Sequence, residues 1–284
     1  MLTLKSPAKI NWCLRVLGKR PDGYHDIWSV MQKIDLFDTL HFRRTPGGIS
    51  VYTEPDIGVR PEENLVYRAA HLFKNYTSCP FGVEVYLKKE IPAQAGLGGG
   101  SSNAATTLLA LNRLWDSGLD KRALMGMAKE LGSDVPFFLS ESLAVVQGRG
   151  ERITPLEGEQ RKRWLLLVKP SFGVSTKEAY SGLDRYSTSG IDITGADVFL
   201  KGSDEELCPY LINDLEKVAF RLYPELSRLK ERLLEGGSLC ALMSGSGSAL
   251  FGLFPSRQDA EVAAKGFNDC WHRVVSTYGG KDFL

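Results

Sequence analysis

A glycine-rich segment between a strand pattern and a helix pattern is the feature that most constrains this sequence. The segment reads Gly-Leu-Gly-Gly-Gly-Ser-Ser-Asn over residues 96–103. Apolar residues alternate over residues 81–88, as on a half-buried strand, and recur at helical spacing over residues 104–115. Ser101 or Ser102 is the candidate N-cap of that helix. The sequence therefore predicts a strand, a loop and a helix in direct succession.

The glycines of this loop favour the binding of an anion. Glycine adopts backbone conformations that other residues rarely adopt, so consecutive N–H groups converge on one point, and the following helix adds the positive end of its dipole. The P-loop lysine is absent, and Ser101 stands where a dinucleotide-binding fingerprint starting at Gly96 needs its last glycine. A flexible turn is the alternative reading. Because three successive glycines are costly unless a ligand approaches closely, we expect a phosphate group here, with ATP as the ligand.

Composition argues against several classes of partner. A chain of 284 residues with 43% hydrophobic and 24% charged residues can bury a large core, in one large domain or two smaller ones. Its 35 Lys and Arg residues balance 34 Asp and Glu residues, so we expect no nucleic-acid partner. The apolar runs are shorter than the roughly 20 residues that span a membrane, and charged residues interrupt the N-terminal stretch. We therefore expect no membrane partner and a cytoplasmic location.

The cysteines are scattered along the chain. They are Cys13, Cys79, Cys208, Cys240 and Cys270. Their number is odd, and no two of them form the C-x-x-C pair typical of zinc or redox sites. The sequence therefore predicts reduced thiols and no metal-ligating residues.

Strand and helix patterns alternate through the rest of the chain and indicate an α+β fold. Further helices are predicted over residues 121–131, 226–234 and from residue 256, and further strands over residues 143–147, 164–168, 240–243, 249–254 and 272–277. Polar, proline-bearing sequence over residues 149–163 favours a crossing between two halves, with a boundary near residue 155. Asn213 and Glu216 form a predicted capping box for a helix that runs through Leu222.

Two further segments carry side chains suited to catalysis. Residues 6–11 read Ser-Pro-Ala-Lys-Ile-Asn, and residues 131–138 read Leu-Gly-Ser-Asp-Val-Pro-Phe-Phe. Asp134 lies between a helix-ending glycine and Pro136, so we expect it in the first turn of a new helix, where a carboxylate also serves as an N-cap. Lys9, between two apolar residues, is equally consistent with a strand lysine that extends its amine to the surface. Local sequence leaves a structural and a catalytic role open for both residues.

Together these motifs resemble those of the GHMP kinases. Members of this family combine a leading Pro-x-x-x-Asn segment, a Gly-Leu-Gly-Gly-Gly-Ser-Ser loop and a late Gly-x-Gly motif. The corresponding segments here are residues 7–11, 96–102 and 244–248, in the same order. The resemblance implies a two-domain α+β fold. Residues 1–155 would form an N-terminal ribosomal protein S5 domain 2-like domain that binds ATP, and residues 156–284 a C-terminal ferredoxin-like domain.

The resemblance also implies roles for individual residues. Asp134 would be the catalytic base that accepts the proton of the attacking hydroxyl, and Lys9 its partner beside the transferred phosphoryl group. ATP is the implied co-substrate and Mg²⁺ the implied ion. The implied nucleotide-binding residues are Asn64, Leu65, Lys89, Pro92, Ala93, Gln94, Ala95, Gly96, Leu97, Gly98, Gly99, Gly100, Ser101 and Ser102. Gln94 is bulkier than the small residues that relatives often carry there, which predicts a narrower nucleotide entrance.

A further stretch, Gly-Lys-Arg-Pro-Asp-Gly-Tyr-His over residues 18–25, resembles the family members that act on cytidine diphosphate-linked methylerythritol in non-mevalonate isoprenoid biosynthesis. It implies phosphorylation of the 2-hydroxyl of that substrate. The implied substrate-binding residues are Asn11, Tyr24, His25 and Tyr180. The cytosine base would stack on Tyr24 and Tyr180, with about 1–3 kcal/mol for each stack, while His25 contacts its edge.

Two other functions stay open at this level. One is a GHMP kinase that acts on mevalonate, homoserine or a sugar, and recognition of cytidine discriminates against it. The other is a nucleotide-binding regulator without catalytic activity, against which the presence of both Lys9 and Asp134 argues. The sequence is compatible with a monomer or a homodimer.

Overall fold

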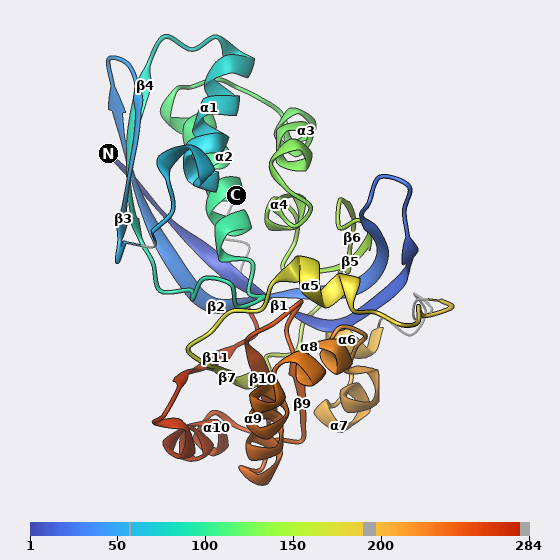
Figure 1. Ribbon diagram of the computed structural model, residues 1–284. Coiled ribbons are helices and arrows are strands. Elements are labelled where there is room, and N and C mark those ends of the chain that lie inside the picture. Colours follow the sequence, from blue (N-terminus) through green and yellow to red (C-terminus); the bar gives the residue numbers. More distant parts are fainter. Residues whose placement is uncertain (57, 190–196, 279–284) are drawn as a thin grey trace.

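The computed structural model describes residues 1–56, 58–189 and 197–278, and within them the strands form two sheets. The larger sheet has the strand order β3-β4-β2-β1-β8, and β5 also pairs with β2 and with β6. Its strands are β1 (Leu2–Lys19), β2 (His25–Thr45), β3 (Ile49–Glu54), β4 (Gly82–Lys88), β5 (Leu143–Gly148), β6 (Arg152–Pro155) and β8 (Ile212–Asn213). β1 and β2 pair antiparallel and curve across the molecule (Figure 1).

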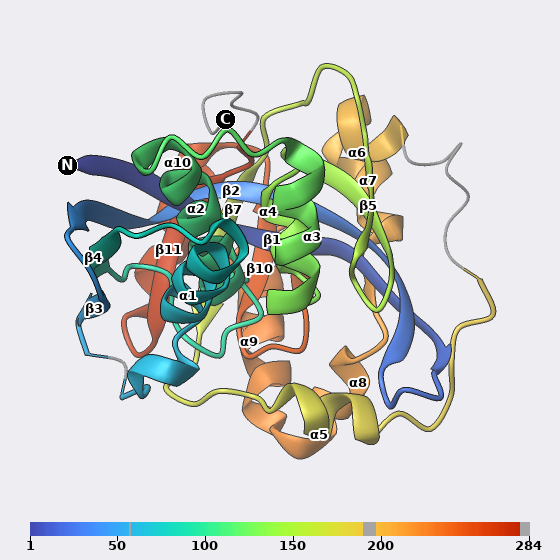
Figure 2. The same cartoon turned by 90° about the horizontal axis from the view of Figure 1, so that it is seen from above.

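Four helices cover one face of the larger sheet (Figure 1, Figure 2). They are α1 (Leu65–Thr77), α2 (Gly99–Leu114), α3 (Lys121–Leu131) and α4 (Val135–Phe138), and the 3₁₀ turn η1 (Pro61–Glu63) precedes the first of them. Their buried faces and the inner faces of β2 and β4 form one hydrophobic core, with Phe42, Phe73 and Leu108 fully buried. The apolar spacing of α3 was read correctly from the sequence, because Leu124, Met127 and Leu131 are all buried.

The smaller sheet has the order β11-β7-β10-β9, and every neighbouring pair is antiparallel. Its strands are β7 (Trp164–Lys169), β9 (Cys240–Met243), β10 (Leu250–Phe254) and β11 (Trp271–Ser276). The elements around it are α5 (Thr176–Ser181), α6 (Asp197–Lys201), α7 (Asp204–Leu207), η3 (Cys208–Tyr210), α8 (Glu216–Leu222), α9 (Pro224–Glu235), α10 (Arg257–Ala264) and η4 (Lys265–Phe267). The predicted strands of this half are confirmed to within two residues at each end.

The two sheets share a hydrophobic core. Trp12 of β1 packs edge-to-face on Phe251 of β10, with ring centroids 5.5 Å apart, and both side chains are fully buried. β8 pairs with β1 in the larger sheet although it lies within the predicted C-terminal domain. The α+β fold is confirmed, and the boundary near residue 155 stays a prediction.

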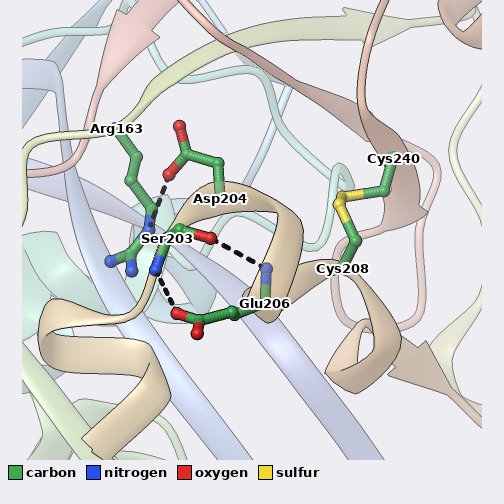
Figure 3. Close-up of a disulfide and its surroundings, with 6 residues drawn as sticks. All are labelled: Arg163, Ser203, Asp204, Glu206, Cys208 and Cys240. Carbon is green, nitrogen blue, oxygen red and sulfur yellow. Dashed lines mark hydrogen bonds and ion pairs between the residues drawn. A yellow bond between two sulfur atoms is a disulfide. The ribbon is translucent and has the colours of Figure 1, made fainter.

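A disulfide joins Cys208 of η3 to Cys240 of β9 (Figure 3). The expectation of five reduced thiols is therefore wrong for these two residues and holds for Cys13, Cys79 and Cys270. Two cysteines 32 residues apart carry no local signal of their pairing. Only the packing of η3 beside β9 brings their Cα atoms to 5.7 Å.

A buried arginine fastens α6 and α7 to the smaller sheet (Figure 3). Arg163, 1% exposed, donates hydrogen bonds to the backbone carbonyls of Val198, Phe199 and Gly202. Its Nε lies 3.3 Å from a carboxylate oxygen of Asp204. Because a buried guanidinium is costly unless it is paired, the bonds of its terminal nitrogens hold this segment against the sheet.

Two helix starts differ from the sequence expectation. Helix α2 begins at Gly99 with Gly98 as its N-cap, so neither Ser101 nor Ser102 caps it. Helix α8 begins at Glu216 with Leu215 at the N-cap position, and Asn213 lies in β8. The predicted capping box is therefore wrong, because both of its side chains bind partners that are distant in the sequence.

Within the described ranges, none of the helices combines the length and apolar character needed to cross a membrane.

Candidate active site

A cavity of about 850 Å³ opens between the glycine loop, β1, the β1–β2 hairpin and α5. Lys9, Asp134, His25 and Tyr180, all predicted from sequence, line it together with the turn that joins β9 to β10. Motifs from the beginning, middle and end of the chain therefore meet in one place. Of the predicted nucleotide segment, residues 92–102, the lining includes Gln94, Gly96 and Gly98.

Gly98 shows why this loop needs glycine. Its φ is +71°, a left-handed conformation, and an added Cβ would lie 2.8 Å from the ring of Phe138 and 3.0 Å from Cγ of Lys9. Helix α2, of 16 residues, starts directly after it without a side-chain cap. The first N–H groups of α2 therefore have no intrahelical partner, as an anion-binding site requires, and Gly98, which precedes them, lines the cavity.

The glycine loop is held against the late turn, residues 244–248. A Cβ on Gly96 would overlap the carbonyl oxygen of Ser244, and the hydroxyl of Ser244 donates to the carbonyl of Gly96 over 3.0 Å. Backbone N–H of Ala249 also donates to Ala95 over 3.1 Å. The two glycine motifs thus form one continuous backbone surface.

Lys9 is held inside the protein. Its backbone N–H donates to the carbonyl of Leu97 over 2.9 Å, which ties β1 to the glycine loop. Its side chain is 3% exposed, and Nζ donates to Oδ1 of Asn11 over 2.6 Å and lies 3.7 Å from Oδ2 of Asp134. Burial lowers the pKa of Lys9, and the charge of Asp134 acts in the opposite direction. The interpretation of Lys9 as a lysine that extends to the surface is wrong.

Asp134 occupies the N-cap position of α4 without capping it. Its side chain makes no cap hydrogen bond, although it precedes Val135, the first helical residue. The carboxylate is one-third exposed and faces the cavity beside Lys9. The purely structural interpretation of Asp134 is therefore wrong, and its oxygens remain available to a ligand.

Asn11 fixes the position of Lys9. Besides accepting from Nζ of Lys9, it donates through Nδ2 to Oγ of Ser29 over 2.8 Å, and Ser29 donates in turn to the carbonyl of Cys13. The chain of bonds is buried and runs from the cavity into the β1–β2 pair. Asn11 lines the cavity, and its predicted contact with substrate stays a prediction.

Aromatic residues from α5 and from the β1–β2 hairpin also line the cavity. The rings of His25 and Tyr180 stack with centroids 5.0 Å apart. Burial lowers the pKa of His25, so its ring is uncharged at neutral pH, and burial followed by the charge of Asp134 raises the pKa of Tyr180. Tyr24 is 51% exposed and lies under the guanidinium of Arg149. Tyr180 therefore stacks on His25 rather than facing Tyr24.

Arg149 is a cavity residue that sequence reasoning missed. It follows β5 in a Gly-Arg-Gly turn, with its guanidinium 5.1 Å from the ring centroid of Tyr24. Gly150 of the same turn packs on Ser133, the neighbour of Asp134. The sequence signal was a lone cation between two glycines, which by itself indicates only a turn.

Three residues implied near adenosine lie outside this cavity, beside the start of α2. Asn64 caps α1 by accepting from the backbone N–H of Val66, and Leu65 lies 3.4 Å from where a Cβ on Gly100 would be. Lys89 pairs with the fully buried carboxylate of Asp38. Their contacts with adenosine stay predictions, and Lys89 is not a free cation.

Gln94 and Ser102 have side chains already engaged with the protein. Gln94 has a left-handed φ of +51° and packs on Gly173, so that it forms the cavity wall between the glycine loop and α5. The hydroxyl of Ser102 accepts from Ser6 over 2.7 Å, and both residues are fully buried. A hydroxyl contribution to nucleotide binding is therefore left to Ser101, which is half-buried.

Comparisons with known proteins agree with this geometry. Residues 64–142 match the family model of the GHMP kinases N-terminal domain, and residues 198–273 match that of the GHMP kinases C-terminal domain. Two relatives are named 4-diphosphocytidyl-2-C-methyl-D-erythritol kinase. The protein from Thermodesulfovibrio yellowstonii is 47% identical, with 98% of each chain covered, and that from Pelotomaculum thermopropionicum is 45% identical, with 93% covered.

Solved structures of GHMP kinases also superpose on this chain. A crystal structure of 4-(cytidine 5'-diphospho)-2C-methyl-D-erythritol kinase superposes with a TM-score of 0.85 at 34% identity, over 98% of this chain and 100% of that one. The homoserine kinase from Cytophaga hutchinsonii superposes with a TM-score of 0.72 at 18% identity, over 98% and 95% of the two chains, which shows likeness of fold. With both family models matched and relatives similar over nearly the full length, this chain belongs to the GHMP kinase family.

Proposed function

We propose that this protein transfers the γ-phosphoryl group of ATP to the 2-hydroxyl of 4-diphosphocytidyl-2-C-methyl-D-erythritol, giving the 2-phosphate and ADP, in non-mevalonate isoprenoid biosynthesis. The observation that carries the proposal is the meeting of three features in one cavity. The Lys9–Asp134 pair lies beside the uncapped N-terminus of α2, and a pair of stacked rings, His25 and Tyr180, lines the same cavity. The names of the full-length relatives support the choice of substrate.

We assign a different role to each member of the charged pair. The substrate hydroxyl attacks the γ-phosphorus, the bond from that phosphorus to the β,γ-bridging oxygen breaks, and ADP leaves. The carboxylate of Asp134 orients the hydroxyl and accepts its proton as the new P–O bond forms. Lys9 places a buried positive charge beside the transferred group, where it is worth more than in water.

The triphosphate would lie on the glycine loop, with its negative charge at the N-terminus of α2. Among the described residues, no cluster of three or more His, Cys, Asp or Glu side chains has the arrangement that holds a metal ion. Mg²⁺ would therefore enter with the nucleotide and be held chiefly by phosphate oxygens, as is usual for this ion, and Asp134 and Glu178 are carboxylates that line the cavity. The ion would supply positive charge to offset the charge that develops on the phosphates.

The aromatic part of the cavity suits the cytidine diphosphate. The cytosine would stack on the exposed ring of Tyr24, beside the stacked pair of His25 and Tyr180, where the uncharged ring of His25 would contact its edge. Arg149 supplies a cation at the cavity for the diphosphate that links cytidine to methylerythritol, because guanidinium groups bind phosphate oxygens in pairs.

Two attributes stay predictions. A cytoplasmic location suits an enzyme that uses ATP, and the Cys208–Cys240 disulfide is the feature that argues against it, because disulfides are rare in reducing compartments. The protein is predicted to be a monomer or a homodimer, which sedimentation measurements decide.

The test follows ADP release with ATP, Mg²⁺ and 4-diphosphocytidyl-2-C-methyl-D-erythritol, and in parallel with mevalonate, homoserine and galactose. We expect turnover with the cytidylyl substrate alone. Asp134→Asn is expected to lower kcat at least a hundredfold with both ligands still bound. Asp120→Asn is the matched control, because Asp120 caps α3 through its side chain and asparagine caps equally well. Turnover with another alcohol and none with the cytidylyl substrate would reject the proposed acceptor.

A further inference from the structure

Asn213 binds the turn between β9 and β10 from outside the cavity lining. Its Nδ2 donates two hydrogen bonds, one to the carbonyl of Met243 and one to the carbonyl of Gly245, each 2.7 Å long. Its Oδ1 accepts from the backbone N–H of Leu215 over 3.0 Å. The side chain is buried, and both of its donors are used on the two residues that flank Ser244.

Glu216, three positions after Asn213, also binds the end of β9. Glu216 accepts the backbone N–H of Met243 over 3.1 Å and pairs with Lys230 through its other oxygen. Both backbone polar groups of Met243 are therefore bound by side chains of one short segment. Met243 is the last residue of β9, so the segment fixes the point at which the strand becomes the turn.

The turn that Asn213 binds is in contact with the glycine loop and with Lys9. A Cβ on Gly245 would lie 3.2 Å from the carbonyl oxygen of Gly96 and 3.3 Å from Nζ of Lys9. Ser244 donates to the carbonyl of Gly96 over 3.0 Å. A shift of this turn by an ångström therefore displaces either the loop or the lysine.

Asn213 is itself anchored to the strand that carries Lys9. It pairs in parallel register with Leu14 of β1, and the backbone N–H of Asp214 donates to the carbonyl of Leu14 over 2.9 Å. The carboxylate of Asp214 also accepts the N–H of Val16. Asn213 therefore spans from β1 to the late turn and fixes the distance between them.

We propose that Asn213 is a positioning residue for phosphoryl transfer, whose amide sets the turn of residues 244–247 against Gly96 and Lys9. The inference rests on the proposed kinase function and adds to it a residue outside the cavity lining. It also explains the reciprocal capping box that is missing at α8: the Asn213 amide N–H groups and the Glu216 carboxylate bind the turn, and only Oδ1 of Asn213 accepts a local N–H, that of Leu215.

The disulfide provides an internal comparison. The disulfide of Figure 3 joins the same two segments, because Cys208 lies five positions before Asn213 and Cys240 lies at the start of β9, three residues before Met243. Both the disulfide and the hydrogen bonds of Asn213 add to stability. Under the proposal, only the amide also sets the geometry of transfer.

The test compares Asn213→Asp with the double variant Cys208→Ser, Cys240→Ser. The aspartate keeps the size and the acceptor of asparagine but presents oxygen to two carbonyl oxygens. We expect kcat to fall about tenfold to a hundredfold in Asn213→Asp, as for a misplacement of about 1 Å, with KM for the cytidylyl substrate within threefold of wild type. The cysteine variant is expected to lower the melting temperature and to keep kcat within twofold. Equal kcat in Asn213→Asp and wild type overturns the proposal.

The pH dependence of Asn213→Asp separates positioning from general loss of stability. The new carboxyl faces two carbonyl oxygens in a buried site, which raises its pKa. When it is protonated, its O–H can donate to one of these carbonyls, so one of the two lost hydrogen bonds is restored. The ratio of variant to wild-type kcat is therefore expected to rise at least threefold from pH 8 to pH 6. A constant or falling ratio contradicts the proposal.

Ser244→Ala probes the same link if Asn213→Asp does not fold. It removes the hydroxyl bond to Gly96 without touching Asn213, and a kcat within twofold of wild type contradicts the inference. Calorimetric titration with Mg²⁺ and ATP, without an acceptor, gives a readout that does not depend on the acceptor. Weaker nucleotide affinity, by fivefold or more in Asn213→Asp or Ser244→Ala but not in the cysteine variant, supports the positioning role even if the acceptor is another alcohol. If both variants bind the nucleotide as tightly as wild type, and wild type does not turn over the cytidylyl substrate, both proposals are rejected.

Discussion

Nζ of Lys9 lies 3.7 Å from Oδ2 of Asp134 and much closer, at 2.6 Å, to Oδ1 of Asn11. The neutral amide thus takes the direct hydrogen bond, and the carboxylate keeps its oxygens free at the cavity. Lysine and aspartate interact here through charge while each still faces the ligand. A tight ion pair would instead have occupied one carboxylate oxygen and lowered the basicity of the group.

Replacement of the lysine tests this division of roles. Lys9→Met is expected to lower kcat about a hundredfold to a thousandfold, because a buried charge beside the transferred phosphoryl group is removed. KM for the cytidylyl substrate is expected to stay within a few-fold, since the aromatic end of the cavity is untouched. Steady-state kinetics with each substrate varied provide the measurement. Activity within tenfold of wild type would show that Lys9 does not act on the transferred group.

Gly98 is the sharpest steric constraint on the nucleotide. Gly98→Ala is expected to weaken ATP affinity at least tenfold, since its Cβ strains a left-handed φ and meets the ring of Phe138. Gly126→Ala is the control, because Gly126 lies within α3, its φ is not left-handed and an added Cβ meets nothing within 4 Å. Alanine there should raise stability by about 0.5–1 kcal/mol. Calorimetric titration with ATP checks both, and equal affinity in the two variants would contradict the fit.

Arg149 is predicted to act on the acceptor and not on ATP. Arg149→Gln is expected to raise KM for the cytidylyl substrate about tenfold, equivalent to about 1.4 kcal/mol, while KM for ATP changes less than twofold. Arg152→Gln is the matched control, because Arg152 is exposed on β6 and outside the cavity lining. An equal rise in both KM values would show that Arg149 supports the folded structure and does not bind the diphosphate.

Lys33 gives a prediction for stability against pH. Its buried ammonium donates to the carbonyls of Phe138 and Ser140 at the end of α4, and burial lowers its pKa to about 8, with Glu141 acting against burial and Lys121 with it. The unfolded value is about 10.4. The lysine is charged in both states below pH 8, and between pH 8 and 10 it loses its proton in the folded state first. The free energy of unfolding should therefore rise with pH in this window, by up to about 3 kcal/mol from this residue.

Urea unfolding at pH 7.5 and pH 10 measures that rise. Lys33→Met removes the titrating group, so its free energy of unfolding should increase less between the two pH values than that of wild type. Lys162→Met is the control, because it removes an exposed lysine and leaves the buried Lys33 in place. This variant is expected to show the same increase as wild type. The same increase in Lys33→Met and wild type would contradict a lowered pKa.

The sequence was most informative where a local pattern matches a local cause. Residues 121–131 repeat at helical spacing, and they form α3 with the same bounds. The glycine loop was predicted as a backbone surface for an anion because only glycine fits such geometry. The motif resemblance then brought Lys9 and Asp134 to one site, which no spacing rule connects across more than a hundred residues.

The misses share one physical reason, which is that tertiary partners outweigh a local pattern. Asn213 and Glu216 have the spacing of a capping box, but the turn at Met243 takes their side chains. Arg149 is one cation in a turn until the β5–β6 hairpin folds beside Ser133. Cys208 and Cys240 become neighbours only when η3 packs beside β9. Each needs the folded chain to be recognised.

The long strand β1 has a consequence for how the two halves of the molecule depend on each other. It carries Lys9 and Asn11, pairs with β2 on one edge and β8 on the other, and buries Trp12 against Phe251 of the smaller sheet. Both halves are therefore built on the same piece of backbone. A displacement of the smaller sheet relative to the larger one would move the strand that carries Lys9, so the packing of Trp12 on Phe251 bears directly on the geometry of the cavity.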